Sequence, residues 1–413
     1  MNYDSKRWLF LVLCFICNGC AGIVYAWSVF IKPIVNQFQW SVADVSLSFT
    51  LMLVLGSFLP FLAGKLQEHI QPRIIILTGG VAFGSGLIGL GYTVTLTELY
   101  VFSAMAGFGL SLVYPAGTIS NIIKFFPDKR GLASGLLTGG ASLGAVAWAP
   151  VAVMMIERVG LLSTFKYLGI AFMMIIVLAS LLIEAAPQGY RPRAMAESAS
   201  AAQDGGTSDI NWTEMLKKPL FYLLAGIFLA VTTSGMMLFG QVSLIAQDVV
   251  NVSPQFAAGI VGLLAIANTA GRLCWGWISD ILGRFPVIFI QLIILAAAML
   301  GLTQATSYFA FASMVMLVGL CYGGFLAIMA PLLADLFGAK YLAVNFGLMF
   351  LMVGAGAFIG PRLAAVMREA TDSYTQAFII AAMLNLAGIL LTFFAKSVSK
   401  RKRLGTCYPM KNL

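Results

Sequence analysis

The sequence predicts an all-α membrane protein in which twelve transmembrane helices form two pseudo-symmetric six-helix bundles. Hydrophobic residues make up 60% of the 413 positions and charged residues only 10%, whereas soluble domains carry roughly 25% charged residues. The apolar residues form blocks of about 20, the length of a helix that crosses a bilayer. Similar motifs recur about 210 residues apart, which indicates a duplicated bundle.

The apolar blocks are separated by short charged or turn-rich breaks. A transmembrane barrel would instead show alternating segments of about ten residues. The predicted spans are about 8–30, 44–66, 73–93, 98–122, 131–155, 164–184, 219–246, 256–279, 285–305, 308–332, 342–367 and 374–395.

The longest break, 185–218, contains prolines, glycines and a run of Ala, Ser and Gly. This composition is typical of a flexible linker. It divides the chain into an N-terminal six-helix bundle (1–184), a cytoplasmic linker (185–218) and a C-terminal six-helix bundle with a basic cytoplasmic tail (219–413). Two similar six-helix units are typical of a secondary transporter whose site lies between the repeats.

The positive charges predict the orientation. Most of the 25 Lys and Arg residues fall in alternate breaks, and cytoplasmic loops carry such an excess. Both termini are therefore expected in the cytoplasm, with the chain a multi-pass monomer of the inner (plasma) membrane. Topology and attraction to the bilayer surface explain the net charge of +9, so no nucleic-acid partner is expected.

Arg272 is the one basic residue that is assigned neither to a break nor to the end of a span, and no acidic residue falls near a span centre. A charge in a span costs about 2.5–3.5 kcal/mol on insertion scales and marks function by default. Two bland alternatives are a salt bridge to another helix and snorkelling toward the cytoplasm near Asp280. The functional interpretation is that Arg272 binds an anionic substrate, because a guanidinium fits a carboxylate with two parallel bonds.

Other polar side chains in the spans are candidates for the same site. Asn268 lies four residues before Arg272 and so on the same helix face. Tyrosine hydroxyls in other spans can donate to an anion, and an amide in span 7 is a weaker candidate. The candidate substrate-binding set is Arg272, Asn268, Tyr114, Tyr322, Tyr25 and Gln241.

Two cytoplasmic breaks carry related loop motifs. Residues 276–284 read GWISDILGR after span 8, and residues 64–73 read GKLQEHIQPR after span 2. The pair resembles the loop signature of the major facilitator superfamily, with the first copy degraded. In that family such residues serve the cytoplasmic gate. The resemblance therefore implies a gating set of Asp280, Arg284, Arg73, Glu68, Asp128 and Arg130.

Further segments narrow the resemblance. They include 125–135 (FFPDKRGLASG), 22–30 (GIVYAWSVF) and 214–219 (EMLKKP). Together they resemble the branch that holds oxalate–formate antiporters and monocarboxylate porters, over essentially the whole chain. The resemblance implies alternating-access transport of a small carboxylate, and it favours Tyr114, Tyr322, Asn268 and Arg272 as site residues.

One position departs from that branch. Oxalate-transporting relatives carry a lysine in span 11 where this chain has Val353. A single positive charge matches a monoanion such as lactate or pyruvate, and oxalate or another diacid is the alternative. Without a membrane Asp, Glu or His, the coupling is either proton symport, with the proton on substrate, Tyr or water, or anion exchange.

Two other classes of protein, a membrane sensor and an enzyme, fit the sequence less well. A carboxylate-binding membrane sensor would signal through its linker or tail, but the linker contains no recognisable domain. An enzyme is not expected, because the sequence shows no nucleophile–base constellation and contains only one His. Neither a cofactor nor a metal is expected, and the string Cys14, Cys17 and Cys20 is interpreted as small packing residues.

Overall fold

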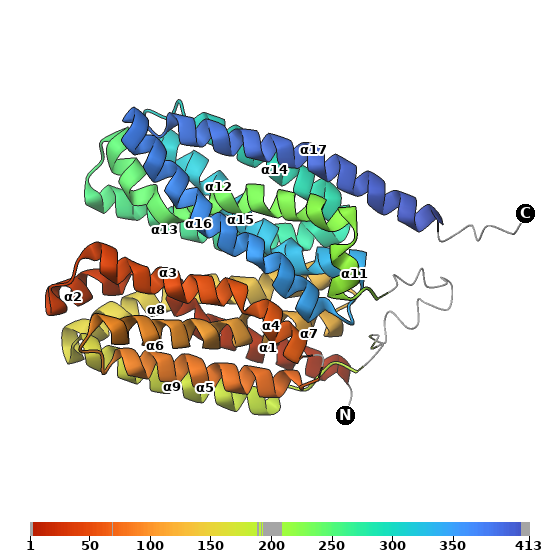
Figure 1. Ribbon diagram of the computed structural model, residues 1–413, viewed down its shortest axis with the longest axis horizontal. Coiled ribbons are helices and arrows are strands. Elements are labelled where there is room, and N and C mark those ends of the chain that lie inside the picture. The colour runs from red at the N-terminus through yellow and green to blue at the C-terminus, as the bar shows by residue number, and fades with distance from the viewer. Residues whose placement is uncertain (1–2, 68, 188–189, 191, 193–208, 406–413) are drawn as a thin grey trace, which may run out of the picture. The chain divides into compact units, whose positions relative to one another are not determined.

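The computed structural model describes residues 3–67, 69–187, 190, 192 and 209–405 (Figure 1). These residues form helices and connecting turns, with no strand in the described part of the chain. They divide into two compact units. Unit 1 comprises residues 1–209 with 329–354, and unit 2 comprises 210–328 with 355–413.

Unit 1 contains the first six predicted spans. Several of them are made of more than one helical piece, with breaks at Gly22–Ala26, Leu59 and Leu112–Gly117. The pieces are α1 (Tyr3–Ala21), η1 (Gly22–Ala26), α2 (Ser28–Phe38), α3 (Val42–Phe58), α4 (Pro60–Leu66), α5 (Pro72–Leu90), α6 (Leu96–Ser111), η2 (Leu112–Gly117), α7 (Ile119–Phe125), α8 (Arg130–Val159) and α9 (Leu161–Leu182).

The helices of unit 2 are mostly long and continuous. They are α11 (Trp212–Leu216), α12 (Pro219–Val250), α13 (Pro254–Leu282), α14 (Arg284–Leu302), α15 (Tyr308–Phe337), α16 (Leu342–Thr371) and α17 (Thr375–Gly405). The last residues of α15 and the first of α16 belong to unit 1. The division into bundles at the linker stays a prediction.

Sequence signals explain where helices begin. Thr95 and Glu98 form a capping box at the start of α6, so two backbone N–H groups are satisfied reciprocally. Pro60, Pro72 and Pro219 stand in the first turn of their helices, where a missing N–H costs nothing. Pro60 also explains why span 2, predicted as continuous, is divided into α3 and α4.

The predicted membrane class is confirmed. Eleven helical segments of the described residues are long and apolar enough to span a bilayer. The helix α13 has 29 residues and is not one of these eleven segments. With α13 the segments make up the twelve spans expected.

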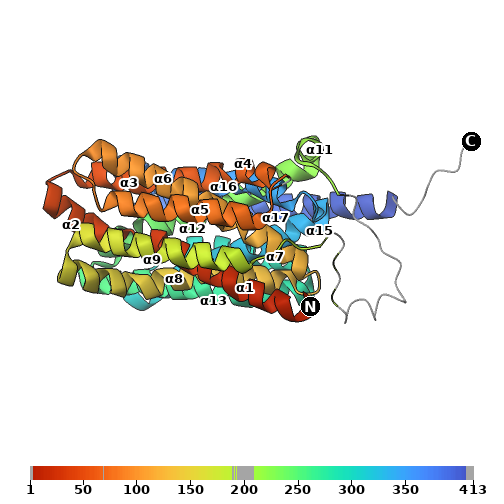
Figure 2. The same cartoon turned by 90° about the horizontal axis from the view of Figure 1, so that it is seen from below.

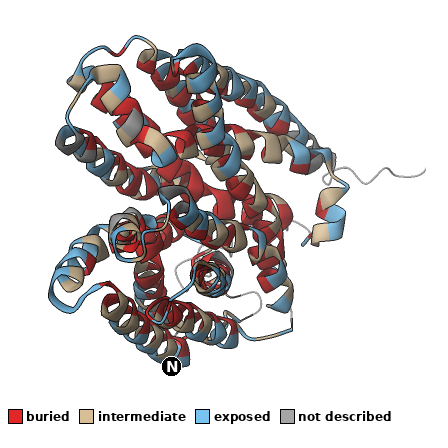
Figure 3. Cartoon of the chain, turned by 60° about the vertical axis from the view of Figure 1, so that its left-hand side comes forward, coloured by how far each residue is buried: buried red, intermediate tan, exposed pale blue. Residues whose placement is uncertain are grey.

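Within unit 1, α5 packs beside both α6 and α9, as Figures 1 and 2 show. Within unit 2, α14 and α17 lie side by side. Buried residues gather on the helix faces that contact neighbouring helices (Figure 3). Large apolar side chains such as Leu178, Leu390 and Phe393 are more than half exposed, as expected for surfaces that face lipid.

Candidate functional site

Arg272 lies in the C-terminal half of α13, and its side chain is buried, with only 2% of its surface exposed. Its Nε donates a hydrogen bond of 3.1 Å to Oδ1 of Asn268, one turn earlier. The Asn268 amide donates in turn to the carbonyl oxygen of Gly319 in α15, at 3.4 Å. The predicted pairing of these two side chains on one helix face is therefore present. The amide of Asn268 thus accepts a hydrogen bond from the guanidinium.

Glycines allow α13 and α15 to pack closely around this pair. A Cβ atom at Gly323 would lie 2.8 Å from the backbone carbon of Asn268. A Cβ atom at Gly271 would lie 2.7 Å from the backbone carbon of Leu320. Only backbone-to-backbone packing fits at this crossing, so the position of Arg272 relative to α15 is narrowly fixed.

Tyr322 lies in α15, two residues after Leu320, and only 2% of its surface is exposed. Its ring packs against Gly235 of α12, and its centroid lies 5.6 Å from that of Phe239. Unit 2 therefore places Arg272, Asn268 and Tyr322 on the neighbouring helices α13 and α15, and their joint role in substrate binding stays a prediction.

Gln241, the weaker candidate in span 7, has a partner in another helix. Its Nε2 donates a 2.8 Å hydrogen bond to the carbonyl oxygen of Pro361 in α16. Pro361 interrupts the hydrogen-bond ladder of α16 because it has no N–H. The amide of Gln241 thus links α12 to the proline-containing turn, and a role in substrate binding stays a prediction.

Tyr114, a candidate in unit 1, lies in the break η2 and has an extended backbone, with φ −128° and ψ 126°. Its side chain is 5% exposed and packs edge-to-face on Phe350 of α16, with 6.2 Å between centroids. Val353 lies three residues after Phe350 and is also buried. Val353, where the resemblance implies a lysine, therefore lies one helical turn after Phe350, whose ring packs against Tyr114.

Tyr25, the other candidate in unit 1, lies in the 3-10 segment η1 and is 39% exposed. Span 1 was predicted as one continuous block, but η1 separates α1 from α2. The irregular segments of spans 1 and 4 therefore each carry a candidate tyrosine.

Sequence reasoning missed a buried polar pair beside the span 4 break. Asn18 of α1 and Thr118 are both fully buried, and Thr118 Oγ1 donates to Asn18 Oδ1 at 2.9 Å. One signal could have found it, because an asparagine in the middle of an apolar span requires a partner.

Four of the six residues predicted to form the gate make ion pairs near helix ends. Asp280 and Arg284 pair at 2.7 Å across the turn at Gly283, which has a φ of +86°. Within unit 1, Arg130 pairs with Asp335 of α15 at 2.5 Å. Asp128 instead accepts two bonds from Arg7 of α1, of 2.7 and 3.2 Å.

The structure says less about the other two residues predicted to form the gate. Arg73 is exposed near the start of α5. Glu68 lies outside the described residues, so the prediction for it is untested.

The C-terminal end of α7 is anchored by the segment that follows span 6. Asn121 donates to the carbonyl oxygen of Glu184 at 2.9 Å and accepts from the N–H of Ala186 at 3.1 Å. Glu184 accepts a 2.7 Å bond from Lys6, which lowers the pKa of its carboxyl group. Tyr190 donates to Asp4 at 2.5 Å, and burial together with this bond raises its pKa to about 12.

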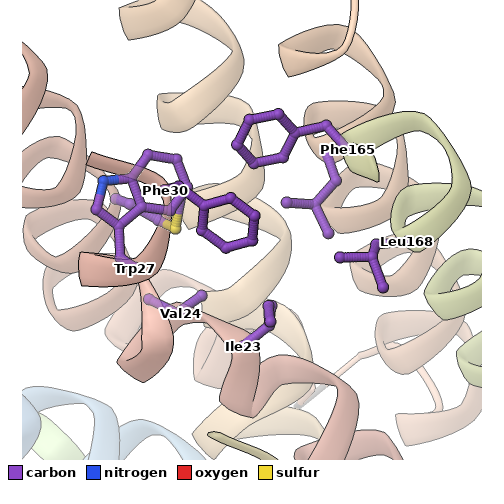
Figure 4. Close-up of a pocket in the computed structure, with 8 residues that line it drawn as sticks. Ile23, Val24, Trp27, Phe30, Phe165 and Leu168 are labelled. Carbon is purple, nitrogen blue, oxygen red and sulfur yellow. The ribbon is translucent and has the colours of Figure 1, made fainter. Parts of the chain in front are cut away.

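Arg272 is not among the residues that line two cavities of the structure. One, in unit 1, has a volume of only about 10 Å³ and an apolar lining that includes Ile23, Trp27 and Phe165 (Figure 4). A cavity of this size holds at most one water molecule, so it cannot hold a carboxylate.

The second cavity, of about 230 Å³, lies in unit 2 among Asp248, Arg368, Asp372 and Tyr374. Arg368 pairs with both aspartates, and the bond to Asp248 is 3.0 Å long. Tyr374 donates to Asp248 at 3.2 Å, and burial, followed by the charge of Asp248, raises its pKa. The two carboxylates offset the charge of Arg368, so this cavity does not favour an anion.

No group of three or more His, Cys, Asp and Glu side chains in the described part of the chain could hold a metal ion. The chemistry that the site residues offer is therefore that of a buried cation with neutral amide and phenol donors. Such groups bind and orient an anion.

Comparisons with known proteins agree on one family. The model of the Major Facilitator Superfamily matches residues 11–316 and 227–406. The uncharacterized MFS-type transporter YhjX of Escherichia coli (strain K12) is 30% identical over 363 residues, which cover 86% of this chain and 87% of that protein.

Two further relatives have named activities. The oxalate:formate antiporter of Oxalobacter formigenes is 28% identical over 402 residues, with 94% of this chain and 91% of that protein covered. Monocarboxylate transporter 13 of Rattus norvegicus is 25% identical over 386 residues, with 90% and 85% covered.

Among solved structures, the crystal structure of the major facilitator superfamily transporter FucP in the outward conformation matches with a TM-score of 0.70. The match covers 94% of this chain and 98% of that chain at 15% identity, and so concerns the fold alone. The extent of the family match and the YhjX relative decide the assignment: the chain is a multi-pass membrane transporter, not an enzyme, and belongs to the major facilitator superfamily.

Proposed function

We propose that this transporter carries small monocarboxylates of the lactate and pyruvate type by alternating access. The observation that carries the proposal is the buried guanidinium of Arg272 in span 8, held by the amide of Asn268. A cation in this environment is expensive, and the cost is offset when an anion binds to it. A guanidinium also presents a planar fork that matches the two oxygens of a carboxylate.

The relatives support a carboxylate as the substrate. Their printed names include an oxalate:formate antiporter and monocarboxylate transporters. Val353 favours the monocarboxylate, because the position that carries a second cation in oxalate-transporting relatives is apolar here. The 28% identity to the oxalate:formate antiporter keeps oxalate or another diacid as the second candidate.

Substrate binding is proposed to change the charge state of the site and so to permit the conformational change. A bound monocarboxylate adds one negative charge beside the guanidinium of Arg272. A ligand shifts a conformational equilibrium only by its differential affinity for the two states. The added charge at Arg272 supplies such a difference, with Tyr114, Tyr322 and Tyr25 as the proposed hydroxyl donors.

The cytoplasmic gate is assigned to charged residues at the helix ends. Arg130 and Asp335 connect the start of span 5 with the end of span 10, and this bond must break for the two spans to separate. The pair Asp280–Arg284 stabilises the turn between spans 8 and 9. Asp128, Arg73 and Glu68 complete the proposed set on the first half of the chain.

The coupling and the cellular setting are proposed on the same grounds. A proton can travel with the carboxylate, or a second anion can return on the same site. The excess of basic residues in alternate breaks supports cytoplasmic termini and insertion in the inner (plasma) membrane. A monomer suffices, because one chain carries both repeats.

Uptake of labelled lactate into proteoliposomes tests the proposal. We expect uptake by the wild type, its loss in Arg272→Ala, and unchanged uptake in Arg158→Ala, which removes an exposed guanidinium at the end of α8. Retained uptake in Arg272→Ala would refute the anion site. Oxalate that competes as well as lactate would favour the diacid, and counterflow without a pH gradient would favour exchange over proton symport.

A further inference from the structure

Span 4 is interrupted where it carries Tyr114. The helix α6 ends at Ser111, and η2 follows, in which the backbone of Tyr114 is extended rather than helical. Helical structure resumes in α7 at Ile119. Within a membrane every backbone polar group needs a partner from the protein, so the groups released by this break must be satisfied by neighbouring residues.

Thr118 provides some of the hydrogen bonds that the backbone of the break requires. Its backbone N–H donates to the carbonyl oxygen of Val113 at 3.1 Å, across the turn that contains Tyr114. Its hydroxyl lies 3.1 Å from the same carbonyl oxygen and 2.9 Å from Oδ1 of Asn18. A hydroxyl has one proton to donate, so two acceptors share it, one inside the break and one in span 1.

Asn18 ties this hydroxyl to a second helix. Its Nδ2 donates to the carbonyl oxygen of Leu137 in α8 at 3.0 Å. Asn18 is fully buried in the last turn of α1, where an unsatisfied amide would cost several kcal/mol. The bonds to Leu137 and Thr118 therefore fix the amide, and the fixed amide gives Thr118 a defined acceptor.

The C-terminal end of α7 is held separately. Asn121 binds the backbone of Glu184 and of Ala186 on both sides of its amide. With α7 anchored there and α6 packed on α3 and α5, the break between them contains the non-helical backbone of span 4. The direction of the Tyr114 side chain depends on the backbone of that break.

We propose that Asn18 and Thr118 are positioning residues for substrate binding: their hydrogen bond sets the backbone of the span 4 break and thereby aims Tyr114 at the carboxylate. The inference rests on the proposed role of Tyr114 in the substrate site. It adds that the affinity contributed by Tyr114 depends on a hydroxyl four residues away that itself does not touch substrate.

The matched variants are Thr118→Val, which removes the hydroxyl and keeps the shape, and Thr118→Ser, which keeps the hydroxyl. Thr164→Val is the control, because Thr164 is equally buried and its hydroxyl bonds only within its own helix, to Gly160. We expect Thr118→Val to raise the KM for lactate about tenfold with a maximal rate per folded transporter within about twofold of wild type. Thr118→Ser should restore the KM, and Thr164→Val should leave it unchanged.

Combination with Tyr114→Phe separates positioning from general stabilisation. If Thr118 acts through the Tyr114 hydroxyl, Thr118→Val should add little to the KM of Tyr114→Phe, because residues that act as a unit are not additive. Effects on KM that multiply, or a KM that Thr118→Val leaves unchanged, would overturn the proposal.

Hydrogen–deuterium exchange of the peptide covering residues 112–118 tests the break without any substrate. We expect faster exchange in Thr118→Val and in Asn18→Leu than in wild type, and wild-type exchange in Thr164→Val. Unchanged exchange in both variants would overturn the inference whatever the substrate is. Faster exchange in a protein that takes up no carboxylate would refute the proposed function and leave the positioning of the break intact.

Discussion

The candidate residues of the two units differ in how the chain presents them. In unit 2, Arg272 and Asn268 lie on one continuous helix, α13, pressed against α15 by glycines. In unit 1, Tyr114 lies in a break of span 4, and Tyr25 lies in a 3-10 segment of span 1. Unit 2 thus offers a charge in a fixed place, whereas unit 1 offers neutral hydroxyl groups on irregular backbone.

This difference suggests a division of labour. A charge buried in a membrane must be held rigidly, since its cost is offset only by well-placed partners. A phenol carries no such cost, and irregular backbone is tolerated at membrane depth where protein covers it. We therefore expect changes in the packing around Arg272 to lower thermal stability as well as binding, and changes near Tyr114 to affect binding first.

The largest expected effect comes from a change at the crossing of α13 and α15 in unit 2. Gly271→Ala places a methyl group 2.7 and 2.9 Å from backbone atoms of Leu320, which cannot move aside. Overpacking of this kind costs about 1–3 kcal/mol, so the melting temperature and the yield of folded protein should fall clearly.

Gly262→Ala is the matched control on the same helix, because a Cβ atom there meets nothing within 4 Å. It should melt close to the wild type. Equal melting temperatures for the two variants would show that the α13–α15 crossing does not fix Arg272 as described.

The next effect concerns the amide that holds the cation. Asn268→Leu removes the acceptor of Arg272 Nε, and a hydrogen bond to a charged group is worth about 1.5–3 kcal/mol. The KM for lactate should rise by about one to two orders of magnitude. Asn268→Asp keeps the acceptor but adds a negative charge that competes with substrate, so it should abolish uptake; full activity in Asn268→Asp would argue against an anion at this site.

A positive charge added near Tyr114 in unit 1 should change substrate selectivity. Val353→Lys introduces a cation on α16, one turn from the ring of Phe350 that packs on Tyr114. Inhibition of lactate uptake by oxalate should strengthen about tenfold relative to inhibition by pyruvate. Val353→Met has a similar unbranched shape without charge, and it should keep the wild-type preference; the same preference in Val353→Lys would remove Val353 from the selectivity argument.

The smallest expected effect concerns the residues that anchor the C-terminal end of α7. The bond from Lys6 lowers the pKa of Glu184, so its stabilisation is present at pH values above the ordinary carboxyl pKa of about 4.3 and is lost as pH falls through the lowered pKa. Glu184→Gln should cost at most about 1 kcal/mol at pH 7, because the pair is partly exposed.

Melting temperatures at pH 7 and below pH 4 check this sign. The difference between wild type and Glu184→Gln should vanish in acid, and Glu157→Gln, a change near the end of α8, should show no difference at either pH. A deficit in Glu184→Gln that persists in acid would assign the effect to packing rather than to charge.

The sequence predicted the parts of the structure that depend on local spacing. The apolar blocks predicted the spans, and the separation of four residues placed Asn268 beside Arg272 because a helix turn brings such residues together. The Asp280–Arg284 pair follows the same rule.

What depends on contacts between distant segments could not be predicted in this way. Thr118 and Asn18 are 100 positions apart, and Arg7 and Asp128 are 121 apart. Periodicity also predicted span 4 as one continuous helix, because an apolar run carries no signal for the extended backbone at Tyr114. The contact of Gln241 with Pro361 is of the same kind, since only the folded helices bring them together.

Thermal stabilisation of the purified transporter by lactate tests the central claim most directly. A ligand present at about 100 times its Kd stabilises the folded state by about 2.7 kcal/mol, so lactate should raise the melting temperature of the wild type and of Arg158→Ala. Arg272→Ala should remain folded and show no increase with lactate at the same concentrations. An increase in Arg272→Ala equal to that of the wild type would contradict the account, because the anion would then bind without the buried cation.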